Sequence, residues 1–385
     1  MTWPKVSIIW LNYNSSKIID IVLKSLESIA DLDYPSDRYE LIVIDNGSTD
    51  KSFERIKNFL DKKNNLRKKI IRLEKNLGFT GGNNIGFRAR DLDSKYIVLL
   101  NNDAIPFDYS LKELVEYAEM RNDIGGIQGV IVNLDNGRVD TAGDMLTEFL
   151  IGAQIYHGRD PMNIKNIKKA FYVTYADGAY SLYRIESIKK ATGFQNKIFY
   201  DEMFAYFDDN ILGLQLWNSN FKIISIPKIV ALHRRSSSFG KISPLKLYLI
   251  IRGFCALNEI TNTRFKLFIR NINILYNIIG GALAMPLVSK LIENYGDKKN
   301  LFTRSKDFIK AIYLGYICGI KWGKNKLKEM NKPIDIYKAP LIKSSPKILI
   351  PWFLGLGSAF GRRILTEIIT KEFEKNIHNY IIDWI

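Results

Sequence analysis

Three polar motifs between residues 12 and 103 carry side chains that could bind a nucleotide or a metal ion. Each follows an apolar run: Asn12 and Asn14, then Asp45, then Asn102 and Asp103. A carboxylate such as Asp45 can accept hydrogen bonds from a ribose hydroxyl or a base N–H. Asp103 suits Mg²⁺ or Mn²⁺, because these hard ions take oxygen ligands and share them with substrate phosphates. The alternative for Asp45 is a turn aspartate that caps the next helix.

A glycine-rich stretch at 76–84 could complete a phosphate or nucleotide site. It contains Asn76, Gly81, Gly82 and Asn83. Glycines let the backbone approach a nucleotide, and exposed N–H groups at a helix start attract phosphate. The stretch lacks the P-loop lysine and the G-x-G-x-x-G spacing, so a structural turn is the alternative.

Two later features could supply a base and a further ligand. Asp208 and Asp209 precede the apolar stretch 211–217, and an aspartate that faces a cleft there is a candidate general base. The alternative is that both carboxylates cap the helix and oppose its dipole. His233 ends the apolar run 228–232 and could bind a metal, although a lone histidine is more often an ordinary hydrogen-bonded residue.

The elements that must position these residues alternate between strand and helix. Apolar runs predict strands at 5–11, 40–45, 69–73 and 95–100, and helices at 16–30, 83–90 and 110–121. Further along, we expect strands at 125–133 and 221–226, a helix at 204–218 and a loop at 152–172. This spacing suits βαβ units on a parallel sheet, whose ligands bind beyond the carboxyl ends of the strands. The polar motifs fall at those ends.

The charge of the chain is unevenly divided. The 385 residues carry a net charge of +16; residues 1–233 hold 30 basic and 30 acidic residues, and 234–385 hold 26 and 10. A basic region binds polyanions, such as nucleic acid, an anionic membrane surface or substrate phosphates. The sequence beyond about 241 is mainly helical by periodicity, so we divide the chain into 1–240 and 241–385.

Several protein classes are disfavoured by the composition. Two cysteines exclude a disulfide framework and a multi-cysteine zinc site. The apolar run 6–11 is short and lacks the basic lead of a signal peptide. The longest uncharged stretch, 271–289, contains Asn, Gly and Pro, which argues against a transmembrane helix. No nucleic-acid-binding motif is present, so we expect no nucleic-acid partner.

Taken in order, the motifs resemble the family 2 glycosyltransferases, and most closely the rhamnosyltransferase-like branch. The resemblance extends over about residues 4–240 and rests on an ordered set of segments: 6–14, 43–50, 76–84, 99–103, 140–143, 177–179, 192–194, 204–209 and 226–233. Three positions depart from the usual pattern. Asp208 stands where the family usually has a glutamate. Asn101 stands where an aspartate is common in the metal motif, so metal affinity is expected to be modest, and Ile211 stands where a second aspartate is common.

The resemblance implies an α/β GT-A fold and inverting transfer from a nucleotide-diphosphate sugar to a hydroxyl of a glycan or polyprenyl-linked acceptor. It implies that Asp209 is the base and that Asp103 and His233 bind Mg²⁺ or Mn²⁺. Inversion is one in-line displacement, which needs that base opposite a leaving diphosphate and positive charge beside the diphosphate. The expected contacts to the nucleotide sugar are Asn12, Asn14, Asp45, Asn76, Gly81, Gly82, Asn83, Asn102, Asp177 and Arg234.

The basic second part interleaves apolar and basic residues, as at 245–252 and 264–270. Helices of this kind can lie in a membrane interface. Because related enzymes often use lipid-linked acceptors, we expect a peripheral protein on the cytoplasmic side of the cell membrane, in contact with anionic lipid. The alternatives are a soluble helical domain with a solvated basic face, a nucleic-acid-binding protein, and an inactive sugar-binding scaffold.

Overall fold

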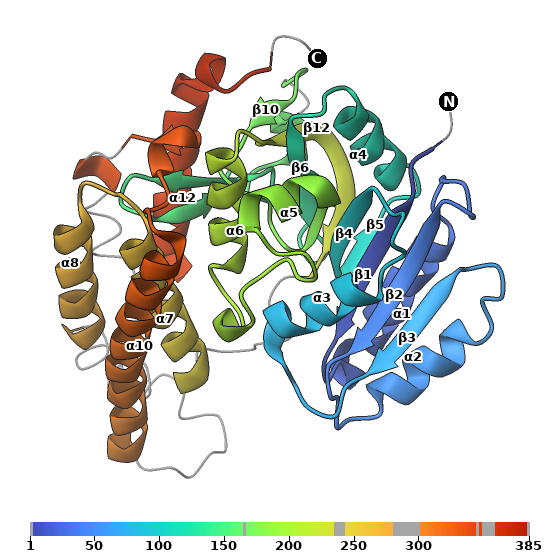
Figure 1. Ribbon diagram of the computed structural model, residues 1–385, viewed down its shortest axis with the longest axis horizontal. Coiled ribbons are helices and arrows are strands. Elements are labelled where there is room, and N and C mark those ends of the chain that lie inside the picture. The colour runs from blue at the N-terminus through green and yellow to red at the C-terminus, as the bar shows by residue number, and fades with distance from the viewer. Residues whose placement is uncertain are drawn as a thin grey trace.

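The computed structural model describes residues 3–164, 167–234, 243–279, 301–343, 346–348 and 359–382. In this part of the chain, a ten-stranded mixed sheet has the order β10-β12-β6-β11-β4-β1-β2-β3, with β5 paired to β12 and β7 paired to β6. Figure 1 shows the sheet with its flanking helices on the right and a group of long helices on the left. The α/β fold class predicted from the sequence is confirmed.

The first third of the chain forms the parallel half of this sheet. Its elements are β1 (Val6–Asn12), η1 (Ser16–Ile18), α1 (Ile19–Ala30), β2 (Tyr39–Asp45), α2 (Ser52–Leu60), β3 (Lys68–Arg72), α3 (Gly78–Ala89) and β4 (Tyr96–Asn101). The predicted strands are confirmed to within one residue at each end. Three of them, β1, β2 and β4, are apolar runs that are largely buried on both faces, whereas β3 is only partly buried.

The second half of the sheet is mixed. Its elements are β5 (Ala104–Pro106), α4 (Ser110–Glu119), β6 (Ile124–Asn133), β7 (Val139–Thr141), η2 (Pro161–Asn163), β10 (Phe171–Tyr172), β11 (Tyr180–Arg184), α5 (Ile185–Thr192), η3 (Asp201–Met203), α6 (Asp208–Asn218) and β12 (Lys222–His233). Strand β11 lies antiparallel between β4 and β6. The strand predicted at 221–226 continues to His233, with an irregular register between Ser225 and Ile229 where Pro227 cannot donate a ladder hydrogen bond.

The strand register brings the carboxyl ends of the parallel strands together. Asn12 is paired with Asp45, and Leu11 is paired with Asn101 on the other side of β1. Asp45 is paired in turn with Arg72 at the end of β3. The polar motifs that follow these strands therefore meet at one edge of the sheet, as predicted.

Most of the glycine-rich stretch at 76–84 is helical, so the helix start predicted at residue 83 was wrong. Helix α3 begins at Gly78, five residues before the predicted start, and includes Gly81 and Gly82. A Cβ atom at Gly82 would lie 2.4 Å from Cδ1 of Leu11, and one at Gly86 would lie 2.5 Å from Cγ2 of Ile9. Gly82 and Gly86 therefore let the helix pack directly on β1.

Gly86→Ala is expected to destabilise the fold by about 1–2 kcal/mol. Overpacking against the β-branched Ile9 costs about 1–3 kcal/mol, and the better helix propensity of alanine offsets at most about 1 kcal/mol. Urea unfolding measures the difference. Arg88→Ala, at an exposed position of the same helix, is the control and should change stability by less than about 0.5 kcal/mol. Equal stabilities of the two variants would contradict the packing argument.

The helix predicted at 204–218 begins only at Asp208. Phe204, Tyr206 and Phe207 have φ values of 60°, 70° and 65°, in the left-handed region that interrupts a right-handed helix. The loop predicted at 152–172 is mostly irregular, although it contains short elements. A second, three-stranded sheet has the order β13-β8-β9, formed by β8 (Asp144–Thr147), β9 (Gly152–Gln154) and β13 (Leu341–Ile342).

The described portions of the basic second part are mainly helical, as predicted. They include α7 (Pro244–Ile260), α8 (Lys266–Ile279), α10 (Leu301–Met330), η5 (Ile336–Lys338), α12 (Ala359–Lys375) and η6 (Ile377–Asn379). This part shares a hydrophobic core with the sheet, since Phe373 of α12 packs on Phe171 of β10 with ring centroids 5.2 Å apart. Within the described residues, no helix is both long and apolar enough to cross a bilayer. Of the uncharged stretch 271–289, residues 280–289 lie outside the described part.

Candidate active site

Asn12 is the hub of the polar network at the sheet edge. Its Nδ2 donates to Oδ1 of Asp45 at 2.8 Å, and its Oδ1 accepts from Nδ2 of Asn102 at 3.0 Å. Its Nδ2 also lies 3.2 Å from the Ser48 hydroxyl. These side chains are all buried. Three of the predicted site residues, from three different strand ends, therefore form one connected hydrogen-bonded group.

Asp45 has no exposed surface in this structure. Besides the bond from Asn12, its Oδ2 accepts a hydrogen bond from the backbone N–H of Ser48 at 3.1 Å and lies 3.6 Å from Nε of Arg72. This geometry matches the turn in the alternative interpretation, but Asp45 does not cap α2, whose N-cap residue makes no side-chain cap hydrogen bond. Asp45 fixes the end of β2 and the position of Asn12, and its contact with a nucleoside remains a prediction.

Asn14 and Asn76 stabilise the loops beside the strand ends. Asn14, with a left-handed φ of 47°, accepts a hydrogen bond at Oδ1 from the backbone N–H of Thr49 at 2.8 Å. Oδ1 of Asn76 accepts from the backbone N–H of Gly78 at 2.7 Å and from Nδ2 of Asn46 at 3.0 Å. Both residues lie at the edge where the sequence predicted them, and their contact with a ligand remains a prediction.

Helix α3 carries the remaining residues of the glycine-rich motif. Gly81, Gly82 and Asn83 are buried, and Nδ2 of Asn83 donates to the carbonyl of Phe79 one turn earlier, at 2.9 Å. Their assigned contacts with the nucleotide sugar are untested. The neighbouring Asn84 has a structural role, since its Oδ1 accepts from the backbone N–H of Ile198 at 2.9 Å.

His233 lies between two buried carboxylates. Its Nε2 is 3.1 Å from Oδ1 of Asp103, and its Nδ1 is 2.8 Å from Oδ2 of Asp140. His233 of β12 is paired with Ala104 of β5, and this pairing places its ring beside Asp103, the residue before Ala104. Burial lowers the pKa of His233, but the hydrogen bonds and negative charges of the two aspartates outweigh burial and raise the pKa to about 9. The ring therefore holds its second proton strongly, and a metal ion at Nε2 would have to displace that proton.

Asp103 and His233 fit a divalent ion that is shared with substrate phosphates. A carboxylate oxygen and an imidazole nitrogen are suitable ligands for Mn²⁺, and the carboxylate suits Mg²⁺. Among the described residues, no group of three or more His, Cys, Asp or Glu side chains could hold a metal ion. The chain thus offers two ligands side by side rather than a complete cage, which leaves the other coordination positions to the substrate and water.

The sequence analysis assigned no role to Asp140. Its carboxylate is fully buried and contacts the ring nitrogen of His233 that faces away from Asp103. A carboxylate in this position fixes the orientation of a metal-binding histidine. Asp140 lies in the 140–143 segment of the resemblance, but it is 93 positions from His233, and no local pattern predicts their contact.

Arg234 directly follows His233. Its backbone N–H donates to the carbonyl of Asp103 at 3.0 Å, and its Nε lies 3.3 Å from Oδ1 of Asp135. The guanidinium therefore belongs to the same end of the sheet as the Asp103–His233 pair. Its predicted contact with a diphosphate is untested.

A second acidic group surrounds the start of α6. Burial, followed by the charges of Asp208, Asp177 and Asp144, raises the pKa of Asp209 well above the usual value for an aspartate. Burial also raises the pKa of Asp208 to about 6. Asp209 keeps some exposed surface, whereas Asp208 is buried. Asp209 is therefore the aspartate of the pair that an incoming hydroxyl can reach, and its raised pKa suits a general base.

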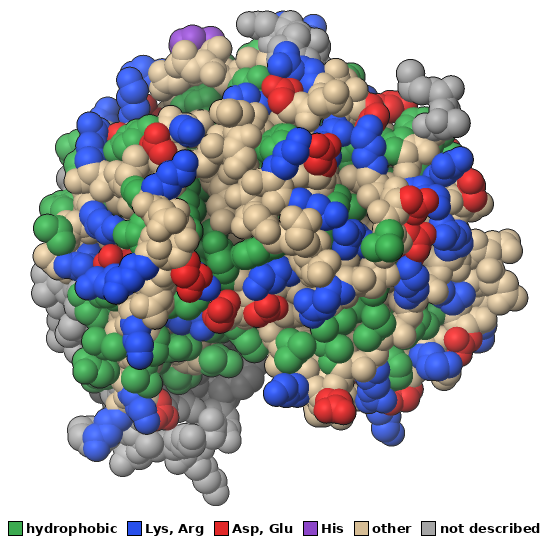
Figure 2. Space-filling view, in the orientation of Figure 1, with side chains coloured by type: hydrophobic (Ala, Val, Ile, Leu, Met, Phe, Trp, Pro, Cys, Tyr) green, Lys and Arg blue, Asp and Glu red, His purple; other side chains and the backbone are tan. Residues whose placement is uncertain are grey.

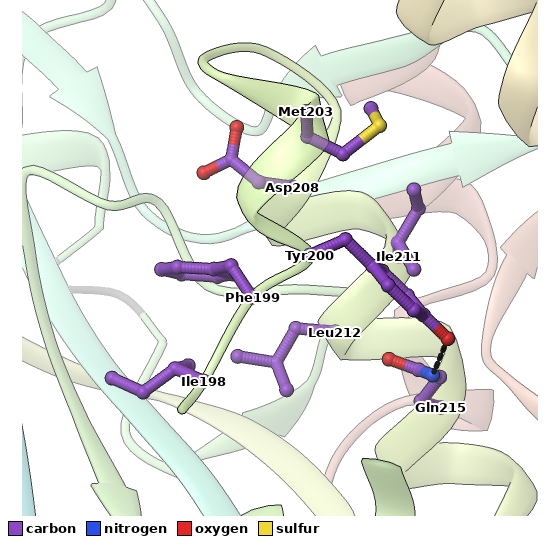
Figure 3. Close-up of a pocket in the computed structure, with 8 residues that line it drawn as sticks. All are labelled: Ile198, Phe199, Tyr200, Met203, Asp208, Ile211, Leu212 and Gln215. Atoms are coloured by element: carbon purple, nitrogen blue, oxygen red, sulfur yellow. Dashed lines mark hydrogen bonds between the residues drawn. The ribbon is translucent and has the colours of Figure 1, made fainter. Parts of the chain in front are cut away.

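Asp208 lines a small, mainly apolar pocket beneath α6. The other lining residues are Ile198, Phe199, Tyr200, Met203, Ile211, Leu212 and Gln215. In Figure 3 the Asp208 carboxylate points away from the hydrogen bond between Tyr200 and Gln215, which is 3.3 Å long. The pocket is separate from the polar strand ends, and its lining matches a packing defect rather than a nucleotide site.

Asp177 lies between the acidic group at the start of α6 and the end of β4 that leads to Asp103. Its Oδ1 accepts from the backbone N–H of Ala179 at 2.8 Å, and the carbonyl of Ala179 accepts from the N–H of Asn101 at 3.0 Å. Asp177 thus lies beside the end of β4, which leads to Asp103, and it is also one of the charges that raise the pKa of Asp209. The predicted base and the predicted metal ligands therefore belong to one region of the molecule.

Comparison with known proteins identifies the family and the fold. Residues 7–192 match the sequence profile described as glycosyl transferase family 2. Residues 7–192 therefore form a family 2 glycosyl transferase domain. The GT-A fold that the resemblance implied is thereby confirmed, while the rhamnosyltransferase-like branch is not.

One sequence relative and two solved structures are similar to the chain that carries this glycosyl transferase domain. The dolichyl N-acetyl-alpha-D-glucosaminyl phosphate 3-beta-D-2,3-diacetamido-2,3-dideoxy-beta-D-glucuronosyltransferase of Methanococcus voltae is 25% identical over 244 residues, which cover 61% of this chain and 68% of the relative. The S. aureus TarS fragment 1–349, solved in complex with UDP-GlcNAc, matches with a TM-score of 0.52 at 16% identity over 97% of this chain and 92% of its own. GalNAc-T7, solved with UDP, GalNAc and Mn²⁺, has a TM-score of 0.55 at 11% identity over 85% of this chain and 57% of its own.

Proposed function

We propose that the protein is an inverting glycosyltransferase that moves a sugar from a nucleotide-diphosphate donor to a hydroxyl of a glycan or polyprenyl-linked acceptor. The observation that carries the proposal is the position of Asp209. It has a raised pKa, retains exposed surface, and belongs with Asp177 to the strand end that leads to Asp103 and His233. A base on one side of a centre and a diphosphate site on the other is what an in-line displacement requires.

In this mechanism Asp209 accepts the proton of the acceptor hydroxyl as its oxygen bonds to the anomeric carbon of the sugar. The bond from that carbon to the diphosphate oxygen breaks on the opposite face, which inverts the configuration. Asp103 and His233 would hold Mg²⁺ or Mn²⁺, which when bound offsets the negative charge of the leaving diphosphate. Arg234 would add a second positive charge beside the same oxygens.

Related proteins support the substrate classes of this proposal. TarS and GalNAc-T7 were solved with a uridine nucleotide sugar and with UDP plus GalNAc, respectively, and the Methanococcus voltae relative is named for a dolichyl-linked acceptor. The resemblance to rhamnosyltransferases adds deoxyhexose donors to the candidates. A thermal-shift screen against UDP-, dTDP- and GDP-sugars with Mn²⁺ tests the donor, since a ligand at 100 times its Kd stabilises the fold by about 2.7 kcal/mol.

Chelation by EDTA is expected to reduce transfer, and added Mn²⁺ or Mg²⁺ is expected to restore it. The reason is that, among the described residues, Asp103, His233 and Arg234 are those that we assign to the metal ion and the leaving diphosphate. Initial rates with and without EDTA measure the effect, with the zinc chelate of EDTA as the control for nonspecific inhibition. Full activity in EDTA would exclude the metal role.

Asp144→Asn is expected to move the acid limb of the kcat profile to lower pH. The charge of Asp144 is one of the causes of the raised pKa of Asp209, so its removal makes Asp209 lose its proton at lower pH. Asparagine retains an oxygen that can accept the hydrogen bond from the Thr141 hydroxyl, which is 2.9 Å long. The control is Asp160→Asn at an exposed position that pairs with Arg138, and it should leave the limb in place. If the acid limb of Asp144→Asn stays at the pH of the wild type, the limb does not report a proton held by this acidic group.

We also propose that the protein works as a peripheral protein on the cytoplasmic side of the cell membrane. The support is the excess of basic residues beyond residue 233 and the lipid-linked substrate in the name of the Methanococcus voltae relative. A basic helical region attracts an anionic membrane surface and would bring the active site near a lipid-linked acceptor.

A further inference from the structure

Helix α10 has one face that is fixed against the rest of the protein. Gly315, Gly319 and Gly323 lie four residues apart and face α7. A Cβ atom at Gly315 would be 2.8 Å from the carbonyl oxygen of Tyr248, and one at Gly319 would be 2.4 Å from that of Arg252. The two helices therefore run side by side at close range, as Figure 1 shows, and the rotation of α10 about its own axis is set.

This rotation turns a row of large apolar side chains outward. Ile309, Tyr313 and Ile317 are spaced four residues apart and are 50%, 64% and 44% exposed, and the neighbouring Leu314 is 39% exposed. A helix at the surface of a soluble protein normally presents polar side chains on its outer face. The outer face of α10 departs from this rule over two turns.

Lysines lie on the same face. Lys310, Lys321 and Lys324 are exposed, and with 3.6 residues per turn they fall within the same arc of about 140° as the four apolar residues. Asp307 is the one acidic residue among the exposed residues of α10 between 306 and 324. Figure 2 shows hydrophobic and basic side chains interleaved on the side of the molecule formed by these helices.

We propose that this outer face of α10 is the surface by which the protein lies against an anionic lipid bilayer. Apolar side chains of an interfacial helix enter the acyl boundary while lysines remain among anionic head groups. Tyrosine also favours this interface, because its ring is apolar and its hydroxyl is polar. The mixture of apolar and basic groups matches an anionic lipid surface better than a purely apolar protein partner.

The surface adjoins the candidate active site along the chain. Helix α7, against which α10 packs, begins at Pro244, ten residues after Arg234. Gly315 of α10 lies level with Tyr248 in the second turn of α7, and Leu245 at the start of α7 is also exposed, by 54%. The proposal rests on the peripheral membrane location proposed above and names the surface that makes the contact; it does not depend on the sugar-transfer reaction.

Co-sedimentation with vesicles tests the proposal. The protein is expected to bind vesicles of equal parts phosphatidylglycerol and phosphatidylcholine, and to bind vesicles of phosphatidylcholine alone at least tenfold more weakly. Raising the salt from about 0.1 M to 1 M should weaken binding to the anionic vesicles, because the Debye length falls from about 10 Å to 3 Å. Equal binding to both kinds of vesicle, or no binding to either, would overturn the proposal.

Two double variants locate the surface. Tyr313→Glu/Ile317→Glu is expected to weaken binding to the anionic vesicles by at least tenfold. The matched control is Leu92→Glu/Met120→Glu, which adds the same charge at apolar positions that are 89% and 51% exposed on the α/β part. If the control loses binding equally, general charge repulsion rather than this face explains the effect.

A third variant distinguishes loss of membrane binding from misfolding of the protein. Lys310→Glu/Lys321→Glu changes only exposed side chains, and it should also weaken anionic binding at least tenfold while circular dichroism and the melting temperature stay unchanged. Retained binding in a folded variant of this kind would overturn the proposal. Failure of the proposed function would appear differently, as absence of nucleotide-sugar binding in the thermal-shift screen, with the vesicle results unaffected.

Discussion

Asp209→Asn is expected to slow sugar transfer by about 10²–10⁴-fold while donor binding persists, because the amide cannot accept the proton of the acceptor hydroxyl. The substitution keeps the size of the side chain and removes one of several negative charges that crowd the start of α6. Donor affinity should therefore stay within a few-fold of the wild type. Initial rates measure the loss of transfer, and calorimetric titration with the nucleotide sugar measures binding.

Glu202→Gln is the control for this experiment. Glu202 precedes Asp209 by seven residues, is exposed, and makes only a long ion pair of 3.7 Å with Lys326. Its substitution should leave both transfer and binding unchanged. Turnover retained by Asp209→Asn would remove Asp209 as the base, and loss of donor binding in that variant would show that Asp209 acts on the donor.

Asp140→Asn is expected to raise the Mn²⁺ concentration needed for half-maximal transfer by about 10–100-fold. Asp140 contacts Nδ1 of His233, so its charge favours a proton on that nitrogen and leaves Nε2 available on the side of Asp103. Asparagine keeps an oxygen in the same place but removes the charge. Titration of activity with Mn²⁺ measures the requirement, and electron paramagnetic resonance of Mn²⁺ with UDP present measures binding without turnover.

Asp160→Asn serves as the control for Asp140→Asn. Asp160 is exposed and pairs with Arg138, so its loss should not alter the Mn²⁺ requirement. An Asp140→Asn protein that is folded and has the wild-type Mn²⁺ requirement would show that Asp140 does not orient His233 for an ion. A changed melting temperature with unchanged Mn²⁺ binding would assign Asp140 to stability alone.

The parallel half of the fold could be predicted from the sequence because its strands are continuous apolar runs. A strand such as β2, which is buried along its whole length, contrasts sharply with the polar residues on either side. The alignment of Asn12 with Asp45 then follows from the parallel register. The start of α3 could not be predicted in this way, because its glycines are explained by contacts with Leu11 and Ile9, about 70 residues earlier.

The candidate site was predictable where residues follow strands and unpredictable where strands meet across the sheet. The contact of His233 with Asp103 depends on the pairing of β12 with β5, and its contact with Asp140 depends on β7. Asp144 lies on β8 of the smaller sheet, where no apolar run marks it as functional. The burial of Asp45 could not be predicted from the sequence either, because a motif does not show how many hydrogen bonds its carboxylate accepts within the protein.

Helix α3 also holds the segment that leads to the base. The N–H of Thr80 donates to the carbonyl of Phe204 at 3.1 Å, and Nδ2 of Asn84 donates to Oδ1 of Asp201 at 2.8 Å. Helix α3 and the segment before Asp209 therefore stabilise each other, although more than a hundred residues separate them in the chain. Chimaeras that exchange sugar specificity should therefore transfer residues 76–89 together with 198–209. Either segment transferred alone would lose the hydrogen bonds that hold it in place.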